Sequence, residues 1–294
     1  MLKINQIIAR VLHSIVHRSG VMIDVRNQIL ITIFEISKAK SLKNIEEFID
    51  CIVGMTTGVP LELIGSIKSD GSYPVALTNK LKATRLISIG VGNNMKFDED
   101  MASRGASIWL YDHTVNVTIK KKFASRMFFS QNGVRGKDLV PNCLTLDEII
   151  EKSNNGCHFD QTILKIDCEG SEWDAFLNVS NHYLSKIDQI CGEFHNLERI
   201  TESDLSAKYL KVLQKFQQDF VVTYIAVNNF TPTVNLINGS IWPFTIEIHL
   251  LNKKLLQEFN LSEISPGYPN CIGYQKLNWH LGGTKNLENW YISK

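Results

Sequence analysis

Three carboxylates come directly after an apolar run between residues 163 and 172, which read Ile-Leu-Lys-Ile-Asp-Cys-Glu-Gly-Ser-Glu. Side chains alternate between the two faces of a strand, so Asp167 and Glu169 would lie on one side of a strand end. Gly170 then allows the backbone to turn. Acids in such a position can hold a cation or receive a proton. The structural alternative is a strand that ends in solvated acids before a helix, whose first turn favours Glu172.

A glycine turn upstream offers a second candidate site. Residues 85–89 read as a short apolar strand that runs into Gly90 and Gly92, where the absence of side chains lets a ligand approach the backbone. Residues 106–112 read as a second strand, which ends in Asp112, 22 positions after Gly90. An acid at the tip of the second strand of a nucleotide-binding unit suits the two hydroxyls of a ribose.

The residues after Gly92 bear on which nucleotide-like ligand this turn would take. The dinucleotide fingerprint Gly-x-Gly-x-x-Gly requires a glycine at position 95, where this chain has Met95. S-adenosylmethionine has no phosphate and carries a sulfonium cation, which suits acid-rich strand ends. The pattern therefore favours S-adenosylmethionine. A nicotinamide-dependent oxidoreductase is the alternative, and the absence of a Tyr-x-x-x-Lys pair counts against it.

Four segments, in this order and spacing, resemble the FkbM-type family of S-adenosylmethionine-dependent methyltransferases. They are SIGVGNNMKFDEDMASRGASIWLYD (88–112), LTLDEI (144–149), ILKIDCEGSEWDAF (163–176) and ICGEFHNL (190–197). A weaker match at residues 64–73 resembles an Asp-Gly-Gly-Tyr segment of one branch of the family, with Ser72 in place of the second glycine. The resemblance implies S-adenosylmethionine as cofactor and methyl transfer to a hydroxyl group of a sugar, a glycan or a glycolipid precursor.

The candidate residues are expected to converge at one edge of a sheet. Parallel sheets bind ligands outside the carboxyl ends of their strands, near the point where the strand order reverses. In this hypothesis Gly90, Gly92 and Asn93 cradle the methionine part of the cofactor, and Asp112 receives the ribose hydroxyls. Glu172 would hold the methionine ammonium or only complement the helix dipole. The predicted cofactor-binding set is Gly90, Gly92, Asn93, Asp112, Asp167 and Glu172.

Two mechanisms are open for activating the acceptor hydroxyl, and the predicted catalytic set is His195, Asp167 and Glu193. In the first, His195 removes the proton, because an ordinary histidine pKa of about 6.5 suits proton acceptance at neutral pH. In the second, the carboxylates of Asp167, Glu169 and Glu193, gathered with the imidazole of His195, form a site for a divalent cation such as Mg²⁺, which acidifies a substrate oxygen. A histidine that is only hydrogen-bonded at a strand edge is the structural alternative. His249 lies in an apolar run and is assigned a structural role.

Seven apolar runs are predicted to form the sheet that positions these residues. For most of their length they alternate with helical stretches, which indicates an α/β fold with a mainly parallel sheet and helices on both faces. With the resemblance, this predicts a Rossmann-like class I methyltransferase with seven strands. The last two runs are expected to pair antiparallel. The runs are 85–89, 107–111, 126–130, 163–167, 189–194, 220–227 and 244–251.

A chain of 294 residues, 44% of them hydrophobic, can bury one large core with small extensions. We expect an N-terminal helical extension and connector at 1–78, the methyltransferase domain at 79–252, and a C-terminal tail at 253–294 that packs on the core. Within the connector, residues 61–80 are predicted to be irregular.

The first 18 residues have apolar side chains at helical spacing and basic ones on the other side, which predicts an amphipathic helix. This helix would pack on the catalytic domain, on a second subunit of a homodimer, or on an anionic membrane surface. No run reaches the roughly 20 apolar residues that span a bilayer, and no secretory signal is visible. The six cysteines include no Cys-x-x-Cys pair. We therefore expect a cytoplasmic protein, in solution or at the inner face of the membrane.

The charge balance argues against nucleic acid as a partner. The chain has 31 basic and 30 acidic side chains and a net charge of +1, and no basic patch interleaved with aromatic residues stands out. The expected partner is a small-molecule or glycan acceptor. The remaining alternative is a non-catalytic scaffold with a methyltransferase-like fold, which acts through its N-terminal helix.

Overall fold

The computed structural model describes mainly the central part of the chain. The described residues are 28, 31, 32, 34, 42–53, 59–65, 71–76, 78, 83–154, 156, 158–228, 231–235 and 241–259. The predicted amphipathic helix at the N-terminus and the tail beyond residue 259 lie outside them.

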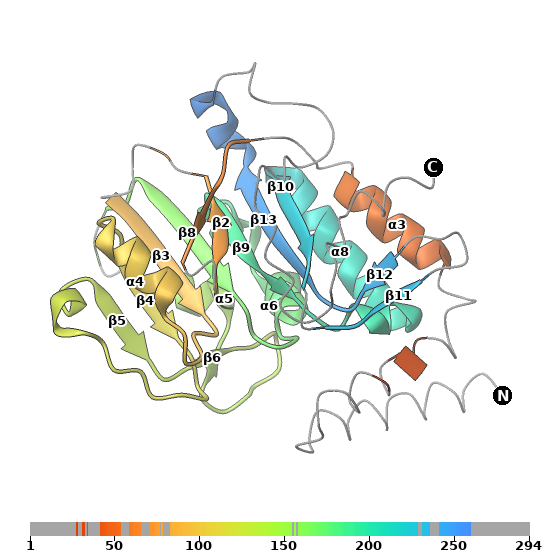
Figure 1. Ribbon diagram of the computed structural model, residues 1–294, viewed down its shortest axis with the longest axis horizontal. Coiled ribbons are helices and arrows are strands. Elements are labelled where there is room, and N and C mark those ends of the chain that lie inside the picture. The colour runs from red at the N-terminus through yellow and green to blue at the C-terminus, as the bar shows by residue number, and fades with distance from the viewer. Residues whose placement is uncertain are drawn as a thin grey trace.

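A seven-stranded, mainly parallel sheet runs through the middle of the molecule (Figure 1). Its strand order is β10-β13-β9-β8-β3-β4-β5, in which β13 is antiparallel to both neighbours and the other pairs are parallel. The predicted mainly parallel sheet and the predicted antiparallel pair, β10 with β13, are confirmed. The strands are β3 Thr84–Ile89, β4 Ser107–Tyr111, β5 Met127–Ser130, β8 Gln161–Ile166, β9 Gln189–Phe194, β10 Phe220–Val227 and β13 Ile246–Asn252.

Alternating side chains of the central strands build one hydrophobic layer on each face of the sheet. Leu86 and Ile163 face a layer that includes α4 (Lys96–Ser103). Their neighbours Ile87 and Leu164 face the opposite layer, to which α5 (Leu146–Lys152), α6 (Glu172–Asn178) and α8 (Ser203–Asp219) contribute. Every residue of β3 and β8 is buried, as expected for parallel strands that are covered on both faces.

Smaller elements surround this three-layered core. Helix α3 (Leu42–Val53) lies beside α8, where Gln217 donates a hydrogen bond to the carbonyl of Cys51 at 3.1 Å (Figure 1). A capping box of Thr145 and Glu148 begins α5. The other elements are α7 Asn181–Leu184, the 3₁₀ helices η3 Lys121–Phe123, η4 Leu197–Thr201 and η5 Lys253–Glu258, and the short strand pairs β6 Gly133–Val134 with β7 Cys143–Leu144 and β11 Thr233–Asn235 with β12 Ile241–Pro243.

The predicted irregular connector at 61–80 contains two short strands instead. β1 (Glu62–Ile64) and β2 (Tyr73–Val75) pair antiparallel. The backbone of Ala76 exchanges two hydrogen bonds with the side chain of Gln189 in β9, at 2.9 and 2.8 Å. Every residue of β2 is buried, and these long-range contacts, which no local pattern shows, tie the segment to the sheet. We predicted that the core begins after this connector. The end of the connector instead packs on the core.

The described residues also bear on membrane crossing and on disulfide pairing. Among the helices of the described residues, none combines the length and the apolar character needed to cross a bilayer. The cysteines within the described part, Cys51, Cys143, Cys168 and Cys191, carry free thiols.

Candidate active site

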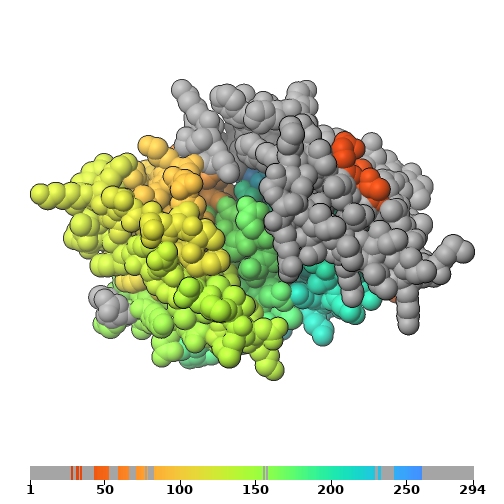
Figure 2. All heavy atoms as spheres, turned by 90° about the horizontal axis from the view of Figure 1, so that it is seen from below, coloured from red at the N-terminus to blue at the C-terminus, as the bar shows by residue number. Residues whose placement is uncertain are grey.

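Residues from three neighbouring strand ends surround one cavity of ≈ 410 Å³. It lies at the carboxyl ends of β3, β4 and β8, where the strand order reverses, because the chain moves from β3 to β4 on one side and later to β8 on the other. Figure 2 views the molecule from this side, with the yellow segment after β4 and the green segment after β8 on the same face. Five predicted cofactor residues line this cavity together: Gly90, Gly92, Asn93, Asp112 and Asp167.

The turn after β3 contains both glycines in the left-handed region, with φ of +74° at Gly90 and +56° at Gly92. A Cβ atom at Gly90 would lie 1.6 Å from the carbonyl oxygen of Asp167, so this glycine is needed for packing between two strand ends. A Cβ at Gly92 would meet nothing within 4 Å. Of these two glycines, Gly92 therefore leaves its backbone open to the cavity, whereas Gly90 does not.

Asp112 is held in place by the two turns that it joins. Its Oδ2 accepts a hydrogen bond from the backbone N–H of Gly92 at 2.9 Å. Its Oδ1 accepts from the N–H and the hydroxyl of Thr114, at 2.7 and 2.6 Å. Burial alone would raise the pKa of Asp112, but these hydrogen bonds lower it below its ordinary value. The carboxylate is therefore ionised and oriented at neutral pH.

Asp167 is oriented by two residues that the motifs did not point to as site residues. The hydroxyl of Tyr73, in β2, donates to Asp167 Oδ2 at 2.9 Å. The ammonium of Lys165 lies 3.9 Å from the same oxygen and donates to the carbonyl of Gly90. The sequence does contain an indication of the role of Lys165, because this residue places a charge inside an apolar part of a strand. Tyr73 was visible only as part of the weaker family match.

Glu172 does not reach the cavity. It is fully buried at the start of α6, and its carboxylate accepts hydrogen bonds from the backbone N–H groups of Cys168 at 2.6 Å and Gly170 at 3.0 Å. The same carboxylate lies 3.1 Å from Nδ1 of His195. The prediction that Glu172 binds the cofactor is therefore corrected: its oxygens are taken up by the loop that they organise.

His195 stands among four carboxylates. Besides the contact to Glu172, its Nε2 lies 3.6 Å from Glu193, 3.7 Å from Glu169 and 3.9 Å from Asp167. Burial would lower the pKa of this imidazole, but the hydrogen bond to Glu172 and the surrounding negative charges outweigh burial and raise the pKa to about 10. An imidazole that is already protonated at neutral pH accepts no further proton. The surrounding carboxylates thus favour the protonated ring and argue against the role of general base that we predicted for His195.

Two of the three carboxylates that we predicted as cation ligands lie together with the imidazole of His195. Asp167, Glu193 and His195 each offer one ligand atom, and these atoms lie within 4.8 Å of one another. Glu169, the third carboxylate predicted as a ligand, is not part of this group: its side chain is 77% exposed and its backbone is left-handed, with φ of +52°. The side-chain amide of Asn228 donates to Glu193 Oε2 at 2.7 Å and orients it. No sequence motif indicated Asn228 as a partner of this acid.

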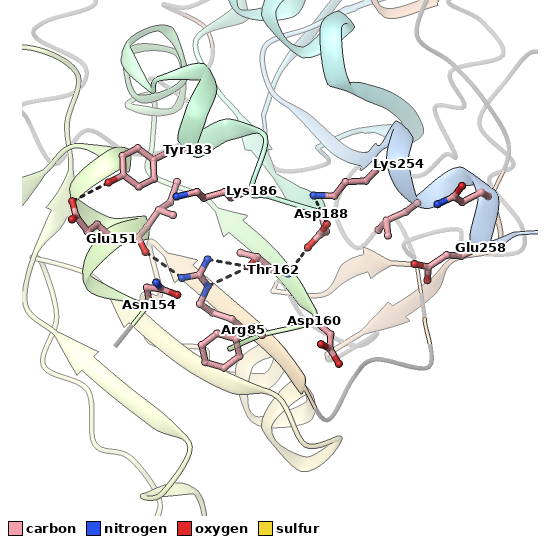
Figure 3. A pocket seen from close by; sticks show the side chains of 14 residues that line it. Arg85, Glu151, Asn154, Asp160, Thr162, Tyr183, Lys186, Asp188, Lys254 and Glu258 are labelled. Carbon is pink, nitrogen blue, oxygen red and sulfur yellow. Dashed lines mark hydrogen bonds and ion pairs between the residues drawn. The ribbon is translucent and has the colours of Figure 1, made fainter. Parts of the chain in front are cut away.

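A second hollow, of ≈ 640 Å³, lies at the opposite edge of the sheet, where the strands begin (Figure 3). Its buried guanidinium, Arg85, donates to the hydroxyl of Thr162 and to the carbonyl of Ile150, so it is satisfied inside the fold. Asp188 likewise accepts from the N–H of Thr162 at 2.6 Å and pairs with Lys254 at 2.8 Å. This arrangement is structural, and the predicted residues lie at the other edge.

His249 has the structural role expected from its apolar run. It is fully buried in β13, and its Nε2 lies 2.9 Å from Gln189 Oε1. Because that oxygen also accepts from the N–H of Ala76, it is the amide oxygen, and Nε2 of His249 must carry the proton. The hydroxyl of Thr223 contacts the other ring nitrogen. Burial lowers the pKa of His249 to about 3, so the ring is neutral.

A model of a known protein family matches the part of the chain that contains this site. The family model described as "Methyltransferase FkbM domain" matches residues 69–225, which is more than half of the chain. No curated protein matches the sequence. Among solved structures, a mutant of the 16S rRNA (adenine(1408)-N(1))-methyltransferase from Catenulisporales acidiphilia is similar over 65% of this chain and 98% of its own, with 9% sequence identity and a TM-score of 0.29. A likeness of that size carries no argument.

Proposed function

Because the chain belongs to the FkbM methyltransferase domain family, we propose that it is an S-adenosylmethionine-dependent O-methyltransferase of the Rossmann-like class I fold. The proposed acceptor is a hydroxyl group of a sugar, a glycan or a glycolipid precursor. The observation that carries the proposal is the meeting of Gly92, Asp112 and Asp167, from three strand ends, around one cavity. The choice of oxygen and of a sugar rests on the family resemblance.

The cavity suits the proposed cofactor in size and in charge. Its ≈ 410 Å³ lies within the range of small-molecule sites, about 300 to 1,000 Å³. The ionised carboxylate of Asp112 stands at the end of β4, where nucleotide-binding units accept ribose hydroxyls. Gly92 offers backbone without a side chain in the way. The acids of the wall favour a cation such as a sulfonium.

S-adenosylmethionine, when bound, supplies a methyl group whose C–S bond breaks, with the electron pair remaining on sulfur, as the acceptor oxygen forms the new C–O bond. The residues of the chain contribute by holding the acceptor oxygen in line and by receiving its proton. Asp167 and Glu169 line the cavity and carry acceptor oxygens. They replace His195 as the proposed proton acceptors, because His195 is an imidazolium at neutral pH.

Calorimetric titration with S-adenosylhomocysteine tests the cofactor part of this proposal. We expect one molecule per chain, and Asp112→Asn should weaken binding about 10- to 100-fold, because it removes charged hydrogen bonds to the ribose. The matched control is Asp160→Asn at the opposite edge of the sheet, where the carboxylate is about half exposed. This variant should bind as the wild type does.

Two outcomes would contradict the cofactor part of the proposal. Failure of the folded wild-type protein to bind S-adenosylhomocysteine would favour the non-catalytic scaffold. Binding of NAD, and not of S-adenosylhomocysteine, would favour the oxidoreductase. For the transfer itself, methyl label from S-adenosylmethionine should appear in a methyl ether of a sugar hydroxyl. Label found only on nitrogen would show that the proposed oxygen acceptor is wrong.

A further inference from the structure

We propose that Asp167, Glu193 and His195 form a binding site for one divalent cation, which sits at the inner wall of the cavity. The site uses one carboxylate oxygen each of Asp167 and Glu193, and Nε2 of His195, which releases its proton to solvent as the ion binds. The proposal that a cation binds depends only on these residues. The proposal that the cation holds the acceptor depends also on the proposed function.

The spacing of the three atoms fits a small cation. Nε2 of His195 lies 3.9 Å from Oδ1 of Asp167 and 3.6 Å from Oε2 of Glu193, and the three residues each offer a ligand atom within 4.8 Å of the others. Ligands about 2.1 Å from an octahedral metal stand about 3.0 Å apart when adjacent and about 4.2 Å apart when opposite. Small side-chain adjustments bring the present atoms into this range. Two carboxylates and an imidazole are ligands that Mn²⁺ and similar divalent ions accept.

His195 is already oriented as a metal ligand would be. Glu172 lies 3.1 Å from Nδ1, an arrangement in which a carboxylate holds the ring and directs Nε2 toward the ion. His195 is 7% exposed, and Nε2 lies 3.6 Å or more from each surrounding carboxylate oxygen, beyond hydrogen-bond length. A buried ring nitrogen thus points into a group of acids without a hydrogen bond to any of them.

The other two ligands are also positioned by neighbours. The hydroxyl of Tyr73 binds Oδ2 of Asp167 and leaves Oδ1 directed toward His195. The amide of Asn228 holds Oε2 of Glu193 at 2.7 Å. Outer contacts of this kind fix metal ligands in place before the metal arrives.

The charge of the site also favours a cation. Four carboxylates, those of Asp167, Glu169, Glu172 and Glu193, lie within 4.0 Å of one imidazole. Two positive charges lie beside them, the protonated ring of His195 before an ion binds and the ammonium of Lys165, 3.9 Å from Asp167. Buried carboxylates are stable when they are paired or bind a metal. A divalent ion would neutralise the excess of negative charge.

The place of the site gives the ion a role in the proposed reaction. Asp167 lines the cavity, so an ion bound to it can also bind oxygens of an acceptor that lies there. An acceptor with two adjacent hydroxyl groups, as in a sugar, would fill two open positions. Binding to the ion acidifies the hydroxyl. Its proton then passes to Glu169, whose side chain is 77% exposed and can release it to water.

Mn²⁺ titration followed by electron paramagnetic resonance tests the site without methyl transfer. The full-length protein, freed of metal with a chelator, should bind one Mn²⁺ per chain, and Asp167→Asn and Glu193→Gln should each weaken binding about tenfold or more. The matched control Asp160→Asn should leave binding unchanged. Thermal unfolding shows whether each variant is folded, and Mn²⁺ should raise the unfolding temperature of the wild type and of Asp160→Asn more than that of the two ligand variants.

The outcomes separate this inference from the proposed function. No stoichiometric Mn²⁺ binding by the folded wild type, or binding unchanged in both ligand variants, overturns the cation site, even where S-adenosylhomocysteine still binds. Mn²⁺ binding without S-adenosylhomocysteine binding leaves the cation site standing and overturns the methyltransferase proposal. Methyl transfer that is unaffected by chelator would overturn the role of the ion in holding the acceptor.

Discussion

A Cβ atom at Gly90 would lie 1.6 Å from the carbonyl oxygen of Asp167, whereas one at Gly92 would point into open space. Both residues belong to the same turn and both have a left-handed backbone. A Gly-x-Gly pattern suggests one shared purpose for its two glycines. At the scale of single residues the purposes differ, because Gly90 lets two strand ends pack and Gly92 leaves backbone open to the cavity.

Alanine substitutions should therefore separate the two glycines. Gly92→Ala should cost about 1 kcal/mol of unfolding free energy, the strain of a left-handed alanine. Gly90→Ala adds a steric overlap with backbone that cannot move freely, and should cost about 3 kcal/mol or more. Urea unfolding measures both values. Equal losses would show that the contact between Gly90 and Asp167 does not constrain the turn.

At the scale of elements, the loop between β8 and α6 depends on one buried acid. Glu172 accepts hydrogen bonds from the N–H groups of Cys168 and Gly170 and contacts His195. Glu148 occupies a comparable place in the first turn of α5, where it accepts from the N–H of Thr145 at 2.7 Å, but its side chain is 45% exposed. Both acids lie at the start of a helix, but Glu172 has contacts with a loop and with His195, whereas Glu148 caps its own helix.

Substitution of these two acids by alanine provides a matched pair. Glu148→Ala should cost about 1 kcal/mol, the usual loss for a helix cap. Glu172→Ala leaves two part-buried N–H groups without an acceptor and the buried ring of His195 without its closest carboxylate, and should cost about 3 kcal/mol or more. Chemical unfolding gives both values, with helix content checked by circular dichroism. A loss at Glu172 no larger than at Glu148 would contradict its role as the organiser of this loop.

At the scale of the whole molecule, two buried histidines respond to pH in opposite ways. The pKa of His249 is lowered to about 3 and that of His195 is raised to about 10. His249 therefore contributes stability that is full above its ordinary pKa of about 6.5 and is lost as the pH falls toward 3. His195, when no cation is bound, contributes stability that is full below about 6.5 and is lost as the pH rises toward 10.

His249→Gln isolates the first of these effects, because both proteins keep His195. Glutamine carries no charge, so the advantage of the wild type over the variant should shrink by about 2 kcal/mol between pH 7 and pH 5. Urea unfolding at several pH values gives the difference. A difference that stays constant over this range would show that His249 is not held neutral in the folded protein.

The sheet was predictable because its strands are apolar runs whose neighbours are set by chain order. Gly90, Asp112 and Asp167 were also predictable, since each comes directly after such a run and parallel strands end at one edge. The pairing of Glu172 with His195 was not, because it depends on how a loop folds back across 23 positions. The pKa of His195 follows from that pairing and from burial, neither of which the motif reveals.

Trp242 shows the same limit for residues 228–243, which lie between the last two predicted runs, 220–227 and 244–251. A tryptophan in a polar loop offers an aromatic face for a sugar, yet Trp242 is fully buried and donates to the carbonyl of Leu197 at 3.0 Å. Its partner lies 45 positions away in the chain. Burial of this kind depends on packing that no local pattern shows.

The hydrogen bond from Tyr73 to Asp167 joins residues 94 positions apart, and that between Ala76 and Gln189 spans 113. During synthesis on the ribosome, the β1–β2 segment is made before β8 and β9. It can form these hydrogen bonds only after those two strands have been made. The wall of the cavity that includes Asp167 is therefore completed late, after more than half of the chain has emerged. A nascent chain stalled before residue 167 cannot yet possess a working pocket.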